Sequence, residues 1–260
     1  MFRWLKAVPR SLLLSIVFTS LLSVAVLGVA IFAASCGSGS RASVRFVHAI
    51  QDETALDIDV NGTPEFTGVS FLGVQPNQPG YTTVPSGNDT LEGLLAGTST
   101  EAFKSSVGWG AGQQYTVIAT GFAKTGTNGS NVVLLSIPDN IPTPPSGDVS
   151  FRVIHASPSG PGSVDVYIEL NPNTAPTPPI TFTGLAYTQA SPYASFSLNP
   201  NNDPNIPGFT VYVTPSGSLQ PIVTQQIYPS VTGEVRTLVL TDVQGQPMMS
   251  STALELTDAN

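Results

Sequence analysis

The segment VRFVHA at residues 44–49 recurs as FRVIHA at residues 151–156. Three further pairs repeat in the same order: LDIDV (56–60) with VDVYI (164–168), FTGVSF (66–71) with FTGLAY (182–187), and GQQYTVI (112–118) with GEVRTLV (233–239). A conserved order of matching segments indicates an internal duplication. The offset between the copies grows along the chain, so the second copy has the longer loops.

The composition of each copy predicts strands rather than helices. Short runs rich in Val, Ile, Thr, Tyr and Phe are bounded by Gly, Pro, Asn and Ser, and the chain holds 24 Gly and 23 Pro. Residues 138–147 (PDNIPTPPSG) form a proline-rich linker, which we expect to be extended and semi-rigid. We therefore expect an all-β fold of two tandem antiparallel β-sandwich (Ig-like) domains, at residues 43–137 and 148–260, behind an N-terminal signal helix.

Basic and acidic residues are distributed unevenly along the chain. Arg3, Lys6 and Arg10 are three of only 9 basic residues, against 17 acidic ones. Removing residues 1–35 leaves 6 basic and 17 acidic groups, which changes the net charge from −8 to −11. Binding to nucleic acid depends on Lys and Arg that displace counterions. An acidic exterior without a basic cluster therefore excludes a nucleic-acid partner.

The first 35 residues read as an export signal. A basic start is followed by 23 apolar or small residues, Leu12–Ala34. As a helix this run would span roughly 35 Å at about 1.5 Å per residue, which is enough to cross a bilayer. The segment is thus long enough for a retained membrane helix as well as for a cleaved signal peptide.

Cys36 is the only cysteine and stands where the apolar run gives way to a Gly/Ser tether, residues 36–42. The stretch FAASC (32–36) resembles a bacterial lipobox, whose cysteine is lipid-modified and becomes the new N-terminus; Ala33 replaces the usual Leu. We predict lipidation at Cys36, with an uncleaved helix or ordinary cleavage as alternatives. Either anchor places the remaining chain on the non-cytoplasmic side of a membrane, by the positive-inside rule. Gly37, rather than Asp, favours the outer membrane if the cell is Gram-negative.

The repeated motifs resemble a bacterial envelope family of tandem domains of unknown function. Members of that family begin R-x-x-H-A-S-P and continue with V-D-V-Y, usually behind a lipoprotein or secretion signal. The second copy matches with RVIHASP (152–158) and VDVY (164–167). The first copy departs with Ile50-Gln51 and with Asp59. The resemblance implies a sandwich-like fold and an envelope location, and it brings no known activity.

Three polar positions recur in both copies. They are Arg45 and Arg152, His48 and His155, and Asp57 and Asp165. One interpretation is a ligand site or an acid/base or metal site in which a His works with a nearby carboxylate. The alternative is a structural set that satisfies backbone groups at the edge of the sandwich. Each copy has one His, so the spacing alone does not complete a catalytic or metal site, and we predict no cofactor.

Two other segments are candidate ligand sites. Asp57, Asp59 and Asn61 fit the first half of an EF-hand loop, but Gly68 stands where the closing Glu belongs. These three residues are a calcium candidate, and the alternative is a strand that enters an Asn-Gly turn. Trp109, in the glycine-rich GWGAG (108–112), is either a core residue or an exposed aromatic that stacks on a sugar or a partner.

These features favour a non-catalytic lipoprotein of the cell envelope. We predict a binding or adhesion module for a protein, a glycan or an envelope polymer, with recognition in loops at the ends of the sheets. The alternatives are an extracytoplasmic hydrolase that uses a His/Asp pair, and a structural spacer without a ligand. A serine hydrolase elbow, G-x-S-x-G, is absent from the sequence.

Overall fold

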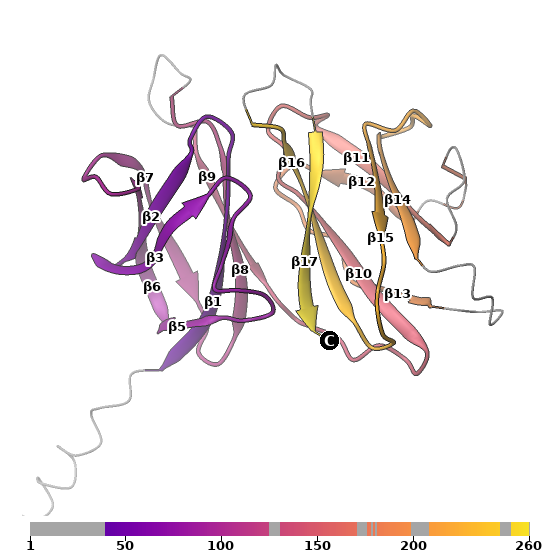
Figure 1. Cartoon of the computed structure of the whole chain (residues 1–260), viewed down its shortest axis with the longest axis horizontal. Coiled ribbons are helices and arrows are strands. Elements are labelled where there is room, and N and C mark those ends of the chain that lie inside the picture. The colour runs from indigo at the N-terminus through magenta and orange to yellow at the C-terminus, as the bar shows by residue number, and fades with distance from the viewer. Residues whose placement is uncertain are drawn as a thin grey trace, which may run out of the picture. The chain divides into compact units, whose positions relative to one another are not determined.

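The computed structural model describes residues 40–124, 131–170, 176–177, 179, 181–198, 208–244 and 251–259. The predicted signal helix and Cys36 lie outside this part of the chain. Within it, no helix is long and apolar enough to cross a membrane. The prediction of an all-β fold is confirmed, because every helix or strand of the described residues is a β-strand (Figure 1).

The first copy builds two sheets. Its strands are β1 (Arg41–Ile50), β2 (Ala55–Val60), β3 (Thr63–Ser70), β4 (Val74–Gln75), β5 (Thr82–Pro85), β6 (Gly87–Leu95), β7 (Glu101–Trp109), β8 (Gln114–Gly121) and β9 (Val133–Pro138). The first inner sheet has the order β4-β1-β8-β9, with β5 also paired to β1. The first outer sheet has the order β3-β2-β6-β7.

The second copy repeats this arrangement. Its strands are β10 (Asp148–His155), β11 (Ser163–Leu170), β12 (Phe182–Ala186), β13 (Ala194–Ser197), β14 (Phe209–Pro215), β15 (Val223–Ile227), β16 (Val235–Asp242) and β17 (Ser251–Ala259). The second inner sheet has the order β13-β10-β16-β17, and the second outer sheet has the order β12-β11-β14-β15.

One pairing in each copy differs from the expected antiparallel sandwich. β1 pairs with β8 in parallel, and β10 pairs with β16 in parallel. In each copy the chain leaves the inner sheet after its first strand, builds the outer sheet, and returns to the inner sheet in the original direction. Side-chain alternation is the same in parallel and antiparallel strands, so the residue pattern did not reveal this pairing.

Burial distinguishes the inner sheets from the outer ones. Every residue from Val47 to Ile50 of β1 is buried, whereas buried and half-buried residues alternate along β2. A strand covered on both faces reads as a continuous apolar run, and a strand with one solvated face alternates. The inner sheets are therefore central layers, each packed on both sides.

Three hydrophobic clusters fill these spaces. One lies within each sandwich, with Phe46 and Leu91 in the first and Phe151 and Phe209 in the second. The third cluster is shared by the two inner sheets and contains Val47, Ala49, Ile118, Leu135, Ile154, Ala156, Val239 and Leu256. Accordingly, Arg41–Asn260 forms one compact unit with two sandwiches inside it.

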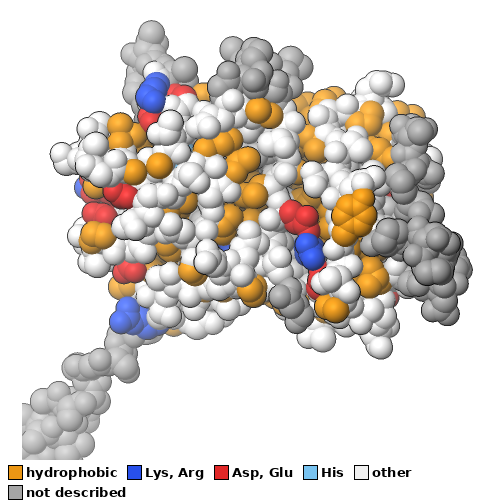
Figure 2. Space-filling view, in the orientation of Figure 1, with side chains coloured by type: hydrophobic (Ala, Val, Ile, Leu, Met, Phe, Trp, Pro, Cys, Tyr) orange, Lys and Arg blue, Asp and Glu red, His pale blue; other side chains and the backbone are white. Residues whose placement is uncertain are grey.

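Most of the surface is uncharged. Among the described residues, seven acidic side chains are buried: Glu53, Asp89, Asp139, Asp165, Glu234, Asp242 and Asp258. Figure 2 accordingly shows a face dominated by neutral polar and apolar groups, with few charges. The surface therefore carries much less negative charge than the net charge of the sequence suggests, because many of the carboxylates are buried and accept internal hydrogen bonds.

Candidate functional site

The two repeated arginines join the copies to each other. Arg45 on β1 has a fully buried side chain, and its Nε donates to Thr116 Oγ1 at 2.8 Å within its own copy. Its other two nitrogens reach the second copy, where Nη1 donates to the Thr257 carbonyl at 3.1 Å and Nη2 pairs with Asp258. The charge of Arg45 is therefore neutralised at the interface between the copies.

Arg152 on β10 makes the same contacts in reverse. Its Nε donates to Thr237 Oγ1 at 2.7 Å, its Nη1 donates to the Pro138 carbonyl at 3.2 Å, and its Nη2 pairs with Asp139. Each arginine thus takes its carboxylate from the opposite copy. Such reciprocal contacts define an isologous, two-fold-like interface.

Two tyrosines complete this arrangement. Tyr81 donates its hydroxyl to Asp139 at 2.8 Å, and Tyr193 donates to Asp258 at 2.9 Å. The guanidinium of Arg45 lies 5.3 Å from the ring centre of Tyr81, and that of Arg152 lies 4.8 Å from the ring centre of Tyr193. Burial and the adjacent carboxylate raise the pKa of both phenols. We call these two arginines, two aspartates and two tyrosines the exchanged network.

The exchanged network is electrostatically closed. Burial opposes the charge of Arg45, but its attraction to Asp258 and Asp139 outweighs that effect and raises the pKa of the guanidinium. All three guanidinium nitrogens of each arginine are already hydrogen-bonded. The network is therefore a structural connection and offers no free charge to a substrate.

His48 is buried and neutral. Its Nδ1 accepts the Ile50 N–H at 3.2 Å, and its ring meets Phe71 edge-on at 6.0 Å between centres. No hydrogen bond of normal geometry reaches its Nε2 from the described residues. Burial lowers the pKa of His48 from 6.5 to about 4, although the nearby Glu53 backbone favours the protonated form.

His155 occupies the equivalent place in the second copy. Its Nε2 is 2.8 Å from the Pro161 carbonyl, and its Nδ1 accepts the Ser157 N–H at 3.4 Å. These contacts fit the tautomer that carries hydrogen on Nε2. Burial lowers its pKa as well, against the hydrogen bond to Pro161 and the charge of Asp242. Both histidines are buried, and no carboxylate of the described residues is hydrogen-bonded to either of them.

Each repeated aspartate connects a bulge in its neighbouring strand with a turn. Asp57 accepts the Gly68 N–H at 2.6 Å and the Gly97 N–H at 2.8 Å. The two glycines have φ of +61° and +73°, a conformation that other residues rarely adopt. The carboxylate of β2 thereby connects a bulge within the neighbouring β3 with the turn between β6 and β7.

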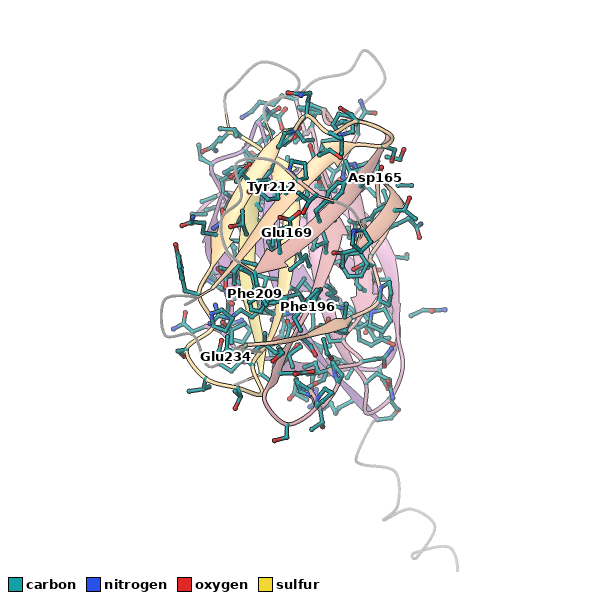
Figure 3. All side chains as sticks on the ribbon, turned by 90° about the vertical axis from the view of Figure 1, so that its right-hand side faces the viewer. Asp165, Glu169, Phe196, Phe209, Tyr212 and Glu234 are labelled. Atoms are coloured by element: carbon teal, nitrogen blue, oxygen red, sulfur yellow. The ribbon has the colours of Figure 1, made fainter. Side chains whose placement is uncertain are left out.

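Asp165 does the same for the second outer sheet, near the start of β11 (Figure 3). It accepts the Gly184 N–H at 2.7 Å, the Gly217 N–H at 2.8 Å and the hydroxyls of Ser216 and Thr183. Burial opposes its charge, but these donors outweigh burial and lower the pKa of Asp165. The V-D-V motif is thus a structural clamp.

Two of the three residues of the calcium candidate already use their side-chain oxygens in hydrogen bonds. Both oxygens of Asp57 already accept backbone N–H groups. Asn61 donates to Asp89 at 2.6 Å and accepts from the Thr90 N–H at 2.9 Å, at the Asn-Gly turn after Asp59. Among the described residues, no three His, Cys, Asp or Glu side chains gather in a metal-binding arrangement.

Trp109 belongs to the core. Its side chain is 3% exposed, it packs in the first hydrophobic cluster, and its Nε1 donates to Ser136 Oγ at 3.3 Å. The exposed stacking aromatic considered from the sequence is therefore not present at this position, because the last residue of β7 points inward.

A cleft of about 620 Å³ lies beside the exchanged network. One wall is the end of β9 and the segment that follows it (Ile137, Pro138, Asn140 and Pro142). The other is the loop between β12 and β13 (Thr188 to Tyr193), with Arg152 also in the lining. A second hollow of about 380 Å³ extends along β12 and shares residues 189–192 with the cleft.

Sequence reasoning missed four of the six residues of the exchanged network. Asp139, Asp258, Tyr81 and Tyr193 were not singled out. The sequence did contain a signal for these residues. Each aspartate stands two residues after an aliphatic residue near the end of the last strand of its copy. Each tyrosine directly precedes a short strand, β5 in the first copy and β13 in the second. Extending the alignment of the two copies through their final strands would have paired these residues.

Residues 42–167 match a family model described as "Domain of unknown function (DUF4397)". The match runs from the second residue of β1 through the whole first copy and into β11. The first copy is therefore similar to this family, whose description brings no activity. None of the curated proteins compared with the chain matches it.

Two solved structures are similar to the chain at low scores. One is a family CBM26 module of Eubacterium rectale Amy13K in complex with maltoheptaose, with 11% identity, a TM-score of 0.25, and 82% of this chain and 95% of that chain covered. The other is the Bacillus anthracis TIE protein, with 7% identity, a TM-score of 0.23, and 82% and 34% covered. At these TM-scores the likenesses carry no conclusion about what the chain binds.

Proposed function

We propose that this protein is a non-catalytic module of the cell envelope that binds a protein, a glycan or another envelope polymer. The observation that supports the proposal is that the repeated polar residues have structural roles. The arginines and histidines are buried, and the aspartates are committed to backbone turns. The residues that would serve a hydrolase are thus committed to structure, and the open cleft is lined by loop residues, where rigid scaffolds usually keep recognition.

A capture experiment tests this function. Residues 41–260, which form one compact unit, are immobilised and incubated with envelope extracts. We expect a specific envelope component to be retained by the folded protein and lost from a heat-unfolded sample. Failure to retain any component above the unfolded control would contradict the binding function. Turnover of an envelope substrate by the same preparation would favour the hydrolase.

We also propose that the module is anchored through lipid on Cys36 and faces away from the cytoplasm, on the outer membrane in a Gram-negative cell. The lipobox-like FAASC and the Gly/Ser tether support this location. Replacing Cys36→Ser should abolish labelling with a radioactive fatty acid and release or block processing of the protein. Membrane retention of the wild-type chain without label would show that the helix, and not a lipid, is the anchor.

A further inference from the structure

The two copies differ in length at one loop beside the exchanged network. Leu72 and Thr188 are equivalent, since each has positive φ and donates its N–H to the carbonyl of the repeated histidine. From there the copies stay in register to Pro76 and Pro192. Tyr193 follows Pro192 directly, whereas the four residues Asn77–Gly80 separate Pro76 from Tyr81.

In the first copy this insertion lies against the end of β17. Gln78 Oε1 accepts the N–H of Thr257. Thr257 is also the residue whose carbonyl accepts a hydrogen bond from Arg45 of the exchanged network. The inserted loop therefore covers the strand end that leads to Asp258.

In the other half of the two-fold-like arrangement, the cleft lies at the position equivalent to this loop. Pro138 is the counterpart of Thr257, because its carbonyl accepts from Arg152. Pro138 has no N–H for a residue such as Gln78 to contact, and the second copy lacks the insertion. Pro138 lines the cleft of about 620 Å³. The cleft thus exists where the two-fold-like arrangement is broken by a missing loop.

The chemistry of the cleft selects against charged ligands. Its charged lining residue, Arg152, is neutralised by Asp139 and has no free nitrogen. Asn140 and Gln189 are exposed, and their side-chain amides make no hydrogen bond to the described residues. An amide offers both a donor and an acceptor, as a sugar hydroxyl does.

Much of the remaining lining is apolar. Pro138, Pro142 and Pro192 contribute ring surfaces, and Tyr193 contributes an aromatic ring that is held on Arg152 and by its hydroxyl on Asp258. A volume of about 620 Å³ falls within the range of small-molecule sites, about 300–1,000 Å³. Rigid rings beside free amides suit a ligand with apolar C–H faces and many hydroxyl groups.

We propose that this cleft binds a neutral oligosaccharide segment, with Asn140 and Gln189 bonding its hydroxyls and Tyr193 and the prolines packing on its sugar rings. This inference rests on the proposed binding function and names its site and ligand class. The ridge at residues 189–192, shared with the hollow along β12, would let a longer chain continue across both.

The test titrates the full chain in detergent with fluorescent neutral oligosaccharides, matched oligosaccharides that contain uronic acids, and proline-rich peptides. We expect neutral oligosaccharides to bind, and Asn140→Ala and Gln189→Ala each to weaken binding about tenfold. The matched control Gln220→Ala, at an exposed turn of the same copy, should bind as the wild type does. Inserting Asn-Gln-Pro-Gly between Pro192 and Tyr193 should fill the cleft and abolish binding.

The outcomes separate this inference from the proposed function. Neutral oligosaccharides that bind equally to the wild type and to both alanine variants would place the ligand elsewhere and overturn the cleft site. Selective binding of acidic oligosaccharides or peptides would overturn the ligand class. Absence of binding to the whole panel, while the capture experiment still retains an envelope component, would overturn this inference and leave the binding function standing.

Discussion

Asp258 and Asp139 each receive an arginine from the opposite copy, so single residues hold two domains together. Asp258→Ala leaves Arg45 buried with only Asp139 nearby, at 3.8 Å. Removing one partner of a buried ion pair costs about 3–5 kcal/mol, because the other charge is left uncompensated. We expect a loss of that size in the free energy of unfolding, measured by urea denaturation.

The paired variant Arg45→Met with Asp258→Leu removes both charges and should recover much of that loss. Glu101→Ala, on the exposed start of β7, is the matched control and should change stability little. Equal stability of Asp258→Ala and the wild type would show that the exchanged network does not contribute to folding.

His48 makes the stability of the protein depend on pH. Its pKa in the folded protein is lowered from 6.5 to about 4, so the unfolded chain binds the proton more readily. Its stabilisation is therefore complete above about pH 6.5 and declines as the pH falls toward about 4, by about 3 kcal/mol at most. Urea unfolding at pH 7 and at a pH between these two values measures the decline.

The variant His48→Asn retains an acceptor for the Ile50 N–H and does not titrate. We expect its stability to fall less than that of the wild type over the same interval. Gln220→Asn, an exposed neutral change, should keep the wild-type dependence. An unchanged pH dependence in His48→Asn would mean that other groups cause the acid sensitivity.

At the scale of the strand and turn, the clamp aspartates organise the outer sheets. Asp165→Ala removes the acceptor of two backbone N–H groups and two hydroxyls at a buried position, which should cost about 3 kcal/mol. Asp57→Ala is the matched change at a partly exposed position. Because water can replace its acceptor there, about 1 kcal/mol is expected. Chemical denaturation of both variants compares the two costs, and a larger loss for Asp57→Ala would contradict the clamp.

For the whole molecule, the shared third cluster should make the two sandwiches unfold together. Ile154→Asp buries a charge in that cluster and should cost about 3 kcal/mol or more, while the two other cores keep their own residues. In residues 41–260, Trp109 is the only tryptophan, so its fluorescence reports the first sandwich alone. We expect fluorescence and circular dichroism to give coincident transitions in the wild type and separate ones in Ile154→Asp.

Leu219→Asp is the control for this experiment, since Leu219 is 54% exposed in the turn between β14 and β15. Its two probes should remain coincident. Coincident transitions in Ile154→Asp would mean that the exchanged network alone couples the sandwiches, and separate transitions in the wild type would show that they fold independently.

The fold class was predictable because it depends on local patterns. Alternation along LDIDV and the turn at Asn61-Gly62 indicate a half-buried strand and a hairpin wherever they occur in a chain. The longer apolar run around Val47 correctly indicated a strand, but its second covered face needed a partner that lies more than 100 residues away.

The sequence by itself determined the duplication, the β class and the residue types repeated in each copy, because these follow from periodicity and alignment. Only the tertiary structure decided what those residues do. It pairs Asp139 and Asp258 each with the arginine of the opposite copy, and it places Asp57 and Asp165 where each accepts backbone N–H groups from two segments. It also opened a cleft where the second copy lacks four residues. Such roles depend on distances between segments that are separated in the chain. The clamps form when each outer sheet assembles, whereas the exchanged network and the cleft form when the two inner sheets pack together.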